Sequence, residues 1–182
     1  LQQATGKRVA VLADGGGQAT IASDRISEAG LELAELSDST RSALRDILFP
    51  QASLANPIDV AGSTDANPGL LSSCMDILAQ DENVDMVFLV GMFGGYGIRF
   101  AEELQQEELH CANAIASLAS RTDKPLVIYS LYAHVKPEPL ERLRKAGLPV
   151  YDSIEHAVKI MSALAERGDY VQRSQLASAM PA

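Results

Sequence analysis

Residues 86–100 read MVFLVGMFGGYGIRF, an apolar run that ends in paired glycines and leads into a helical pattern. The apolar run predicts a strand over residues 86–90 that is buried on both faces and is therefore central in its sheet. Glycines lack a Cβ atom, so an anion can approach their backbone closely. The helix start adds unpaired N–H groups and the positive end of a dipole. We interpret Gly94, Gly95, Tyr96 and Gly97 as a candidate anion cradle; the alternative is a tight turn that packs the helix against its strand.

A second junction of this kind lies near the start of the chain, where VLAD leads into Gly15, Gly16 and Gly17. Its spacing matches neither the dinucleotide-binding pattern GxGxxG nor the phosphate-binding loop with its lysine. Close approach of the backbone to a ligand or a partner subunit remains open here. Two strand–glycine–helix junctions in one small domain indicate a protein that handles phosphates or carboxylates.

Short β-rich runs alternate with amphipathic helical patterns along the whole chain, which is typical of a parallel sheet covered on both faces. The expected strands cover residues 8–12, 31–36, 86–90, 126–129 and 150–151. The fold class predicted is therefore α/β: a flavodoxin-like, doubly wound, five-stranded parallel sheet in three layers. In its strand order, 2-1-3-4-5, the two glycine junctions flank the switch point and lie next to each other.

The helical patterns define one domain over residues 1–168. A single helix is expected after Gly97, with a break near residues 105–108, and the last helix starts after Ser153. Residues 169–182 are polar and are interpreted as a linker or frayed C-terminal tail. Because the chain opens with Leu1 rather than methionine, we expect it to be either an excised piece of a longer protein or a processed product.

Composition narrows the classes of partner. A formal net charge of −9 argues against binding to nucleic acid or to an anionic membrane surface. No apolar run reaches the roughly 20 residues of a membrane span, and no signal peptide is apparent, so we expect a cytoplasmic protein. Cys74 and Cys111 lack metal-ligand spacing, and no metal site is predicted.

Asn56 and Asp59 flank Pro57 and Ile58 in a segment expected to be a loop or a short extended piece. Turn chemistry explains both side chains. The alternative is that the Asn56 amide donates to a substrate carbonyl or carboxylate while Asp59 holds the loop through backbone N–H groups. Arg99 is either an additional anion contact or a solvated charge.

The histidines give no catalytic signature. His110 and His156 fall within helical patterns, whereas His134 follows a strand at the edge where ligands bind in such folds. His134 is the only candidate for chemistry, and a structural role is favoured even there. No catalytic triad order, HExxH or CxxC pattern is present, so no catalytic residue is assigned within this chain.

Three stretches carry a resemblance to a known family: ANPIDVAG (residues 55–62), LAQDENVD (78–85) and FLVGMFGGY (88–96). Together they resemble the CoA-ligase domain of the succinyl-CoA synthetase beta subunit. The stretches SEAGLELAEL, DKPLVI and AGLPVYDSIEHAV are similar to NDP-forming acyl-CoA synthetases. The resemblance covers residues 6–167. The departures are Tyr96, where beta subunits carry isoleucine, and Pro57 with Ile58, which leave the acid substrate open.

The resemblance implies a domain of an enzyme that forms acyl-CoA from a carboxylic acid, CoA and a nucleoside triphosphate through an acyl phosphate and a phosphohistidine. Asn56 and the backbone of residues 95–97 would lie around the carboxylate, and the helix after Gly95 would face the phosphate. The histidine, CoA, ATP or GTP and Mg would belong to CoA-binding and ATP-grasp domains of the same or a partner chain, so the isolated fragment is expected to be inactive. The runner-up is a non-catalytic flavodoxin-like binding or regulatory module, and a flavin protein is a weaker rival.

Overall fold

A computed structural model of the protein describes residues 4–179, with side chains described throughout except at positions 176, 177 and 179. Strands and helices alternate along the chain. The strands are β1 (Arg8–Ala13), β2 (Glu32–Leu33), β3 (Ile58–Asp59), β4 (Met86–Gly91), β5 (Leu126–Ser130) and β6 (Val150–Tyr151). The helices are α1 (Gly16–Glu28), α2 (Asp38–Ile47), α3 (Leu70–Gln80), α4 (Tyr96–Arg99), α5 (Leu104–Ala119), α6 (Glu138–Lys145) and α7 (Ile154–Ala179).

The strands form one parallel sheet in the order β2-β1-β4-β5-β6. This confirms the predicted parallel α/β fold and the order of the five expected strands. The sixth strand, β3, pairs with Leu12 and Ala13 at the end of β1, whereas β2 pairs with Arg8 and Val9 at its start. The expected five-stranded sheet is therefore corrected to six strands, because the buried side chain of Ile58 draws the segment after Pro57 into the sheet.

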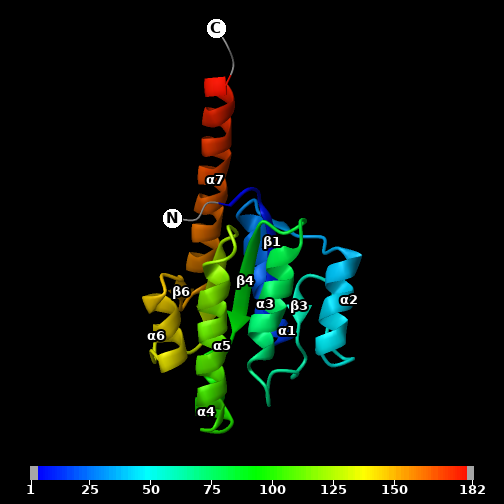
Figure 1. Ribbon diagram of the computed structural model, residues 1–182, viewed down its shortest axis with the longest axis vertical. Helices are drawn as coiled ribbons and strands as arrows, with labels where there is room; N and C mark the ends of the chain where they lie inside the picture. Colours follow the sequence, from blue (N-terminus) through cyan, green and yellow to red (C-terminus); the bar gives the residue numbers. More distant parts are fainter. Residues whose placement is uncertain (1–3, 180–182) are drawn as a thin grey trace.

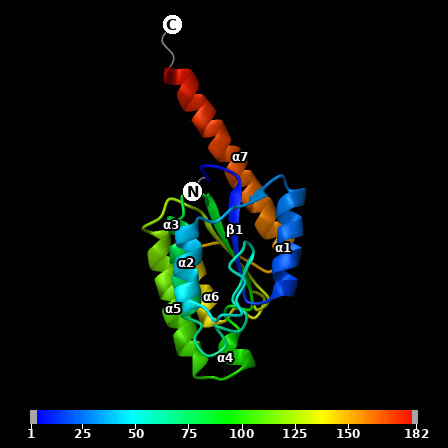
Figure 2. The same ribbon diagram turned by 90° about the vertical axis from the view of Figure 1, so that its right-hand side faces the viewer.

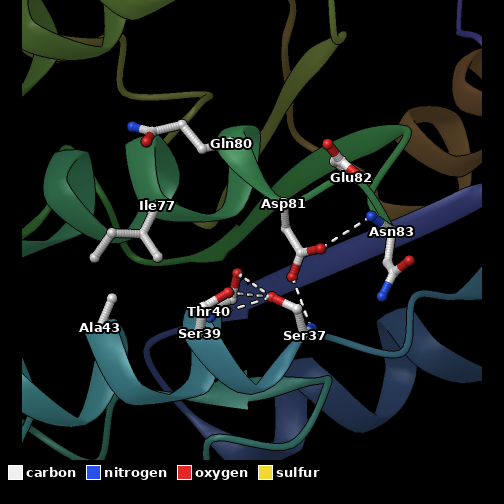
Figure 3. A pocket seen from close by; sticks show the side chains of 9 residues that line it. All are labelled: Ser37, Ser39, Thr40, Ala43, Ile77, Gln80, Asp81, Glu82 and Asn83. Atoms are coloured by element: carbon white, nitrogen blue, oxygen red, sulfur yellow. Dashed lines mark hydrogen bonds between the residues drawn. The ribbon is translucent and has the colours of Figure 1, made fainter.

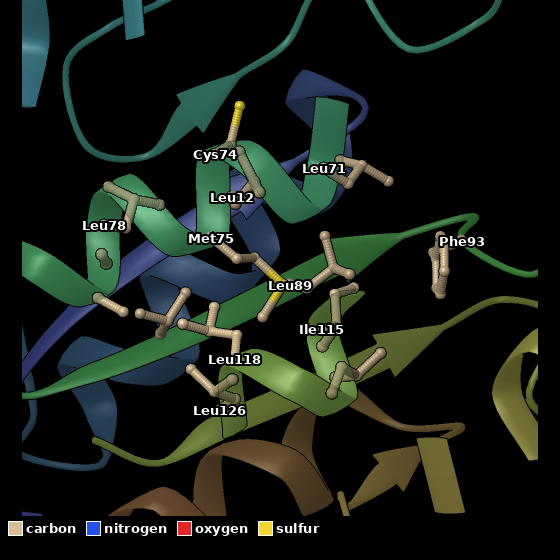
Figure 4. Packing of buried hydrophobic residues seen from close by; sticks show 14 of the residues in the cluster. Leu12, Leu71, Cys74, Met75, Leu78, Leu89, Phe93, Ile115, Leu118 and Leu126 are labelled. Atoms are coloured by element: carbon tan, nitrogen blue, oxygen red, sulfur yellow. The ribbon is translucent and has the colours of Figure 1, made fainter. Parts of the chain in front are cut away.

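The sheet lies between two layers of helices, with α1 and α7 on one face and α2, α3 and α5 on the other (Figures 1 and 2). Strand residues alternate between the faces, as the period of a β-strand requires. Leu12 and Leu89 pack toward α3 and α5 (Figure 4), whereas Val11 and Phe88 pack toward α1 and α7. Burial of both faces explains why β4 reads as a continuous apolar run.

Two expected elements differ from the structure. The helix after Gly97 is divided: α4 ends at Arg99 and α5 begins at Leu104, so the break falls at residues 100–103 rather than at 105–108. The stretch interpreted as a linker or frayed tail is helical as far as residue 179, because α7 continues through it and stands clear of the domain body (Figures 1 and 2). Residues 180–182 of that prediction lie outside the described part. Among residues 4–179, no helix is both long enough and apolar enough to span a membrane.

Candidate functional site

The two glycine junctions lie side by side, because β1 and β4 are neighbours in the sheet and run in the same direction. Ala13 pairs with Val90, so the loops that follow both strands leave the same end of the sheet. A hydrogen bond joins the loops directly: the Met92 amide donates to Oδ2 of Asp14 at 2.8 Å. The candidate site is therefore at the carboxyl ends of the strands, where ligands bind in doubly wound folds.

The amides of the second junction do converge on a single negative charge, but that charge belongs to the protein itself. Oε1 of Glu108 accepts from the amides of Gly94 (2.5 Å) and Tyr96 (3.1 Å), and Oε2 accepts from Gly97 (3.0 Å). The Gly95 amide donates to the Met92 carbonyl at 2.8 Å. The expectation of exposed amides in this turn is wrong, since residues 94–97 are all buried.

Close packing accounts for the glycines of this turn. Gly94 has φ +90°, a conformation that residues with side chains rarely adopt. A Cβ atom on Gly95 would lie 2.2 Å from the Tyr132 ring, and one on Gly97 would lie 2.2 Å from Cγ of Gln105. The structure thus supports the tight-turn alternative for these glycines. It gives the cradle an internal occupant rather than open space for a ligand.

Glu108 was missed because the sequence around it, QQEELHC, is typical of an exposed helix face. A signal was nevertheless present: Leu104, Glu108, Ala112 and Ile115 recur at helical spacing, which places the glutamate on the buried stripe of α5. Its side chain is only 1% exposed. Burial raises the pKa of Glu108, and the backbone amides of the turn oppose that effect.

A second buried hydrogen-bond chain joins three loops at this end of the sheet. The hydroxyl groups of Thr64 and Tyr96 lie 2.7 Å apart, and the Tyr96 hydroxyl donates to Oδ2 of Asp14 at 3.1 Å. Thr64 and Tyr96 are fully buried, and Asp14 is half-buried. Burial raises the pKa of Asp14 to about 6; the bonds from Met92 and Tyr96 oppose this shift, and the carboxylate of Asp59 adds to it.

The first junction has a different character. Gly15 caps α1 without a side-chain hydrogen bond, and Gly16 and Gly17 are exposed. The first N–H groups of a helix have no acceptor within it, and the exposed surface of Gly16 and Gly17 is backbone, because glycine has no side chain. A Cβ atom on Gly16 would lie 3.2 Å from Oδ2 of Asp59. This helix start therefore has exposed backbone, with two carboxylates, Asp14 and Asp59, close by.

Asn56 and Asp59 have internal roles in the structure. The Asn56 side chain donates to the carbonyls of Val9 (2.7 Å) and Ala34 (3.0 Å) and accepts from the Val11 amide (2.9 Å). It thereby fills the gap between β2 and β3 along β1, so its amide already has two protein acceptors. Asp59 accepts from the Ala61 amide at 3.0 Å, which agrees with the predicted role in holding its loop.

The remaining predicted side chains do not gather into a catalytic group. His110, His134 and His156 are all exposed, and His134 lies in the turn after β5. The Arg99 guanidinium lies over the Phe100 ring, 5.7 Å from its centre. Within residues 4–179, no group of three or more histidine, cysteine, aspartate or glutamate side chains is placed to hold a metal ion.

A cavity of about 500 Å³ lies at the opposite end of the sheet, and the side chains that line it are drawn in Figure 3. Asp81 is central to it and accepts from the amides of Ser37 (2.8 Å) and Asn83 (2.9 Å). These bonds fix the start of α2 against the end of α3, which is a structural role. A smaller cavity of about 200 Å³ lies beside Glu108, between Ile98 and Val135.

The architecture defines a class: a doubly wound parallel α/β domain with its glycine turns at one end of the sheet. Comparison with known sequences shows which proteins of this class the chain is similar to. Acetate–CoA ligase [ADP-forming] II subunit alpha of Pyrococcus furiosus is 26% identical over 166 residues, which is 91% of this chain and 35% of that protein. Acetate–CoA ligase [ADP-forming] I of Archaeoglobus fulgidus is 26% identical over 156 residues, covering 86% of this chain and 20% of that protein.

A trans-feruloyl-CoA synthase of an unknown prokaryotic organism is 27% identical over 168 residues, covering 88% of this chain and 22% of that protein. No protein-family model matches the chain. The chain therefore spans about a third or less of the length of these relatives. All three are CoA ligases or synthases by name, and this chain corresponds to one part of them.

Solved structures share the fold of this chain. A crystal structure of a Pyrococcus horikoshii OT3 protein superposes with a TM-score of 0.79 at 27% identity, covering 92% of this chain and 37% of that one. The apo form of the dinucleotide-forming acetyl-coenzyme A synthetase 1 of Ca. Korarchaeum cryptofilum gives a TM-score of 0.72 at 22% identity, covering 94% and 36%. The latter shows the shared fold. The predicted resemblance to NDP-forming acyl-CoA synthetases is confirmed.

Proposed function

We propose that this chain is one domain of an NDP-forming acyl-CoA synthetase, which joins a carboxylic acid to CoA through an acyl phosphate and a phosphohistidine. The observation that carries the proposal is similarity over 91% of the chain to a subunit of an ADP-forming acetate–CoA ligase. The same sequence covers only 35% of that subunit. We therefore expect the CoA-binding and ATP-grasp domains to supply the histidine, CoA, ATP or GTP and Mg, and the isolated chain to be inactive.

Within that enzyme, this domain would present the carboxyl end of its sheet to the phosphoryl group. The start of α1 is the better phosphate contact, because Gly15, Gly16 and Gly17 combine exposed backbone with the positive end of a 13-residue helix. Gly94, Gly95, Tyr96 and Gly97 would contribute amides only if Glu108 moved away. Their role in the acyl pocket, and that of Asn56 and Asp59, stays a prediction, as does a cytoplasmic location.

A domain replacement tests the proposal. The matching segment of the Pyrococcus furiosus ligase II alpha subunit would be exchanged for residues 4–179, and the complete enzyme assayed for acetyl-CoA and ADP formation. The unaltered enzyme and one lacking the segment are the controls. A folded chimera that forms thioester above the deletion control supports the ligase role. A folded chimera no better than that control contradicts it and favours the non-catalytic binding module.

The α1 contact has its own test in an active chimera. Gly17→Asp would place a carboxylate at the helix start, where it repels a phosphoryl group and competes for its amides, and we expect thioester formation to fall by about tenfold or more. The matched control is Ser27→Asp near the other end of α1, where the side chain is exposed. Equal activity of the two variants would refute the contact at α1.

A further inference from the structure

A buried carboxylate without a cationic partner needs a reason to be retained. Glu108 is 1% exposed, and within residues 4–179 its carboxylate accepts hydrogen bonds from the backbone amides of Gly94, Tyr96 and Gly97. Hydrogen bonds from N–H groups to an ionised carboxylate are stronger than those between neutral groups. The glutamate therefore dictates where these amides lie and, through them, the path of the backbone between β4 and α5.

The backbone that Glu108 fixes carries Tyr96, whose hydroxyl reaches the site. The Tyr96 hydroxyl donates its one proton to Asp14 at 3.1 Å and therefore accepts from the Thr64 hydroxyl at 2.7 Å. The amide of the same residue is bonded to Glu108. The backbone amide of Tyr96 thus donates to Glu108, while its side-chain hydroxyl donates to Asp14. A shift of the backbone at residue 96 would move the hydroxyl out of reach of Asp14.

We propose that Glu108 is a positioning residue, an internal anion that shapes residues 94–97 in place of a bound ligand and thereby holds the Tyr96 hydroxyl on Asp14. Asp14, on which Glu108 acts through Tyr96, borders the exposed start of α1. Other groups that face this contact are Asp59 from β3, which raises the pKa of Asp14, and Asp65, which raises that of Tyr96. The inference concerns contacts within this chain and stands or falls independently of the ligase function.

The direction in which the pKa of Asp14 changes when Glu108 is replaced distinguishes a positioning role from a purely electrostatic one. Removing the negative charge of Glu108 would, by Coulomb's law alone, lower the pKa of Asp14 or leave it unchanged. Loss of the Tyr96 hydrogen bond would instead raise it, because that bond stabilises the ionised form of Asp14. Positioning and charge thus predict opposite directions. A defect in global stability alone predicts no selective change at this carboxyl group.

The experiment is an NMR titration of the Asp14 carboxyl carbon in the whole chain. We expect a midpoint near 6 in the unaltered protein. In Tyr96→Phe and in Glu108→Gln the midpoint should rise by roughly one pH unit, the size expected for a hydrogen bond to a charged group. The matched control is Glu107→Gln, which removes the preceding, exposed carboxylate and should leave the midpoint unchanged.

The double variant tests whether Glu108 acts through Tyr96. Its midpoint should equal that of Tyr96→Phe alone, because a lost hydroxyl cannot be displaced further. A midpoint that falls or stays constant in Glu108→Gln while rising in Tyr96→Phe overturns the proposal. If Glu108→Gln does not fold, Glu108→Asp replaces it. This shorter carboxylate cannot reach all three amides, and it too must raise the midpoint for the proposal to stand.

Discussion

Asp14 illustrates how a carboxyl group at the end of a strand acquires an unusually high pKa. It lies half-buried between the loops after β1 and β4, and burial raises its pKa to about 6. Its neighbours include a second carboxylate, Asp59, while Met92 and Tyr96 donate hydrogen bonds to it. A carboxyl group in this setting changes charge close to neutral pH, where an ordinary aspartate remains ionised.

A pH dependence of stability follows from this shift. Because the folded-state pKa of Asp14 exceeds the ordinary 3.8, its contribution to stability is fully present below about 3.8 and is lost as the pH rises through about 6. The loss amounts to at most about 3 kcal/mol. Asp14→Asn should remove that part of the dependence of unfolding free energy on pH between 4 and 7, measured by urea unfolding.

Asp24→Asn provides the control, since Asp24 is exposed on α1 and its removal should leave the slope unchanged. An Asp14→Asn curve parallel to that of the unaltered protein would show that the group titrates at its ordinary pKa. The same variant preserves an acceptor for Met92 and Tyr96, so the loops around it should keep their contacts.

The sequence was sufficient to predict where the glycine turns lie in the fold, but not which side chains form hydrogen bonds with them. The order of strands and glycines was enough to place Gly15, Gly16, Gly17 and residues 94–97 at one end of the sheet. It could not show that Glu108 fills the second junction, because that contact joins residues 14 apart across a helix break. Asn56 is a comparable case: its bonds to Val9 and Ala34 depend on how β2 ends, which local sequence does not encode.

At the scale of elements, the flank of the sheet beside β1 is unusual. Two dipeptide strands, β2 and β3, share that flank, and the Asn56 side chain occupies the gap between them. A carboxamide offers both donors and an acceptor, so it can satisfy backbone groups that would otherwise pair with a strand. The carbonyls of Val9 and Ala34 and the amide of Val11 depend on it.

Removal of this side chain should be costly. Asn56→Ala leaves three backbone groups without their partner, and we expect a loss of roughly 2–4 kcal/mol in the free energy of unfolding. The control is Asn67→Ala, which also precedes a proline but lies exposed in the loop before α3, and should cost less than about 1 kcal/mol. Urea unfolding of both variants measures the difference, and similar losses in the two would contradict the bridging role.

Prediction of elements was accurate where hydrophobic periodicity is strong. The runs at β1, β4 and β5 and the amphipathic patterns of α1, α3 and α7 are all present in the structure. Boundaries were less accurate where tertiary contacts decide them. Gly97 packs against Gln105, which turns the chain sharply and separates α4 from α5, and β3 exists because Ile58 is buried against the sheet.

At the scale of the whole molecule, the two halves of α7 differ in how much they contribute to the core of the domain. Its first half contributes Ile154, Val158 and Met161 to the core on one face of the sheet. Beyond Gly168, the helix leaves the body and touches the start of the chain, where Gln172 donates to the carbonyl of Thr5 at 3.2 Å. A Cβ atom on Gly168 would lie 1.8 Å from the Ala4 carbonyl oxygen, so this crossing requires a glycine.

Shortening the helix should therefore separate its two halves. Removal of residues 173–182 should change the free energy of unfolding by less than about 1 kcal/mol, because the described side chains of that stretch are exposed. Met161→Ala, at a position that is 0% exposed, should cost about 2–5 kcal/mol. Thermal and urea unfolding test both variants. A severe loss on truncation would mean that the projecting half supports the core.

The short outer strands have a consequence for how the molecule behaves among its own copies. Both lateral margins of the sheet end in dipeptides, β2 with β3 on one side and β6 on the other. A long, straight margin offers a row of unpaired peptide groups to which a strand from another molecule can add. Margins this brief give an incoming strand almost nothing to align with, so crowded solutions of the native domain should resist growth into fibrils.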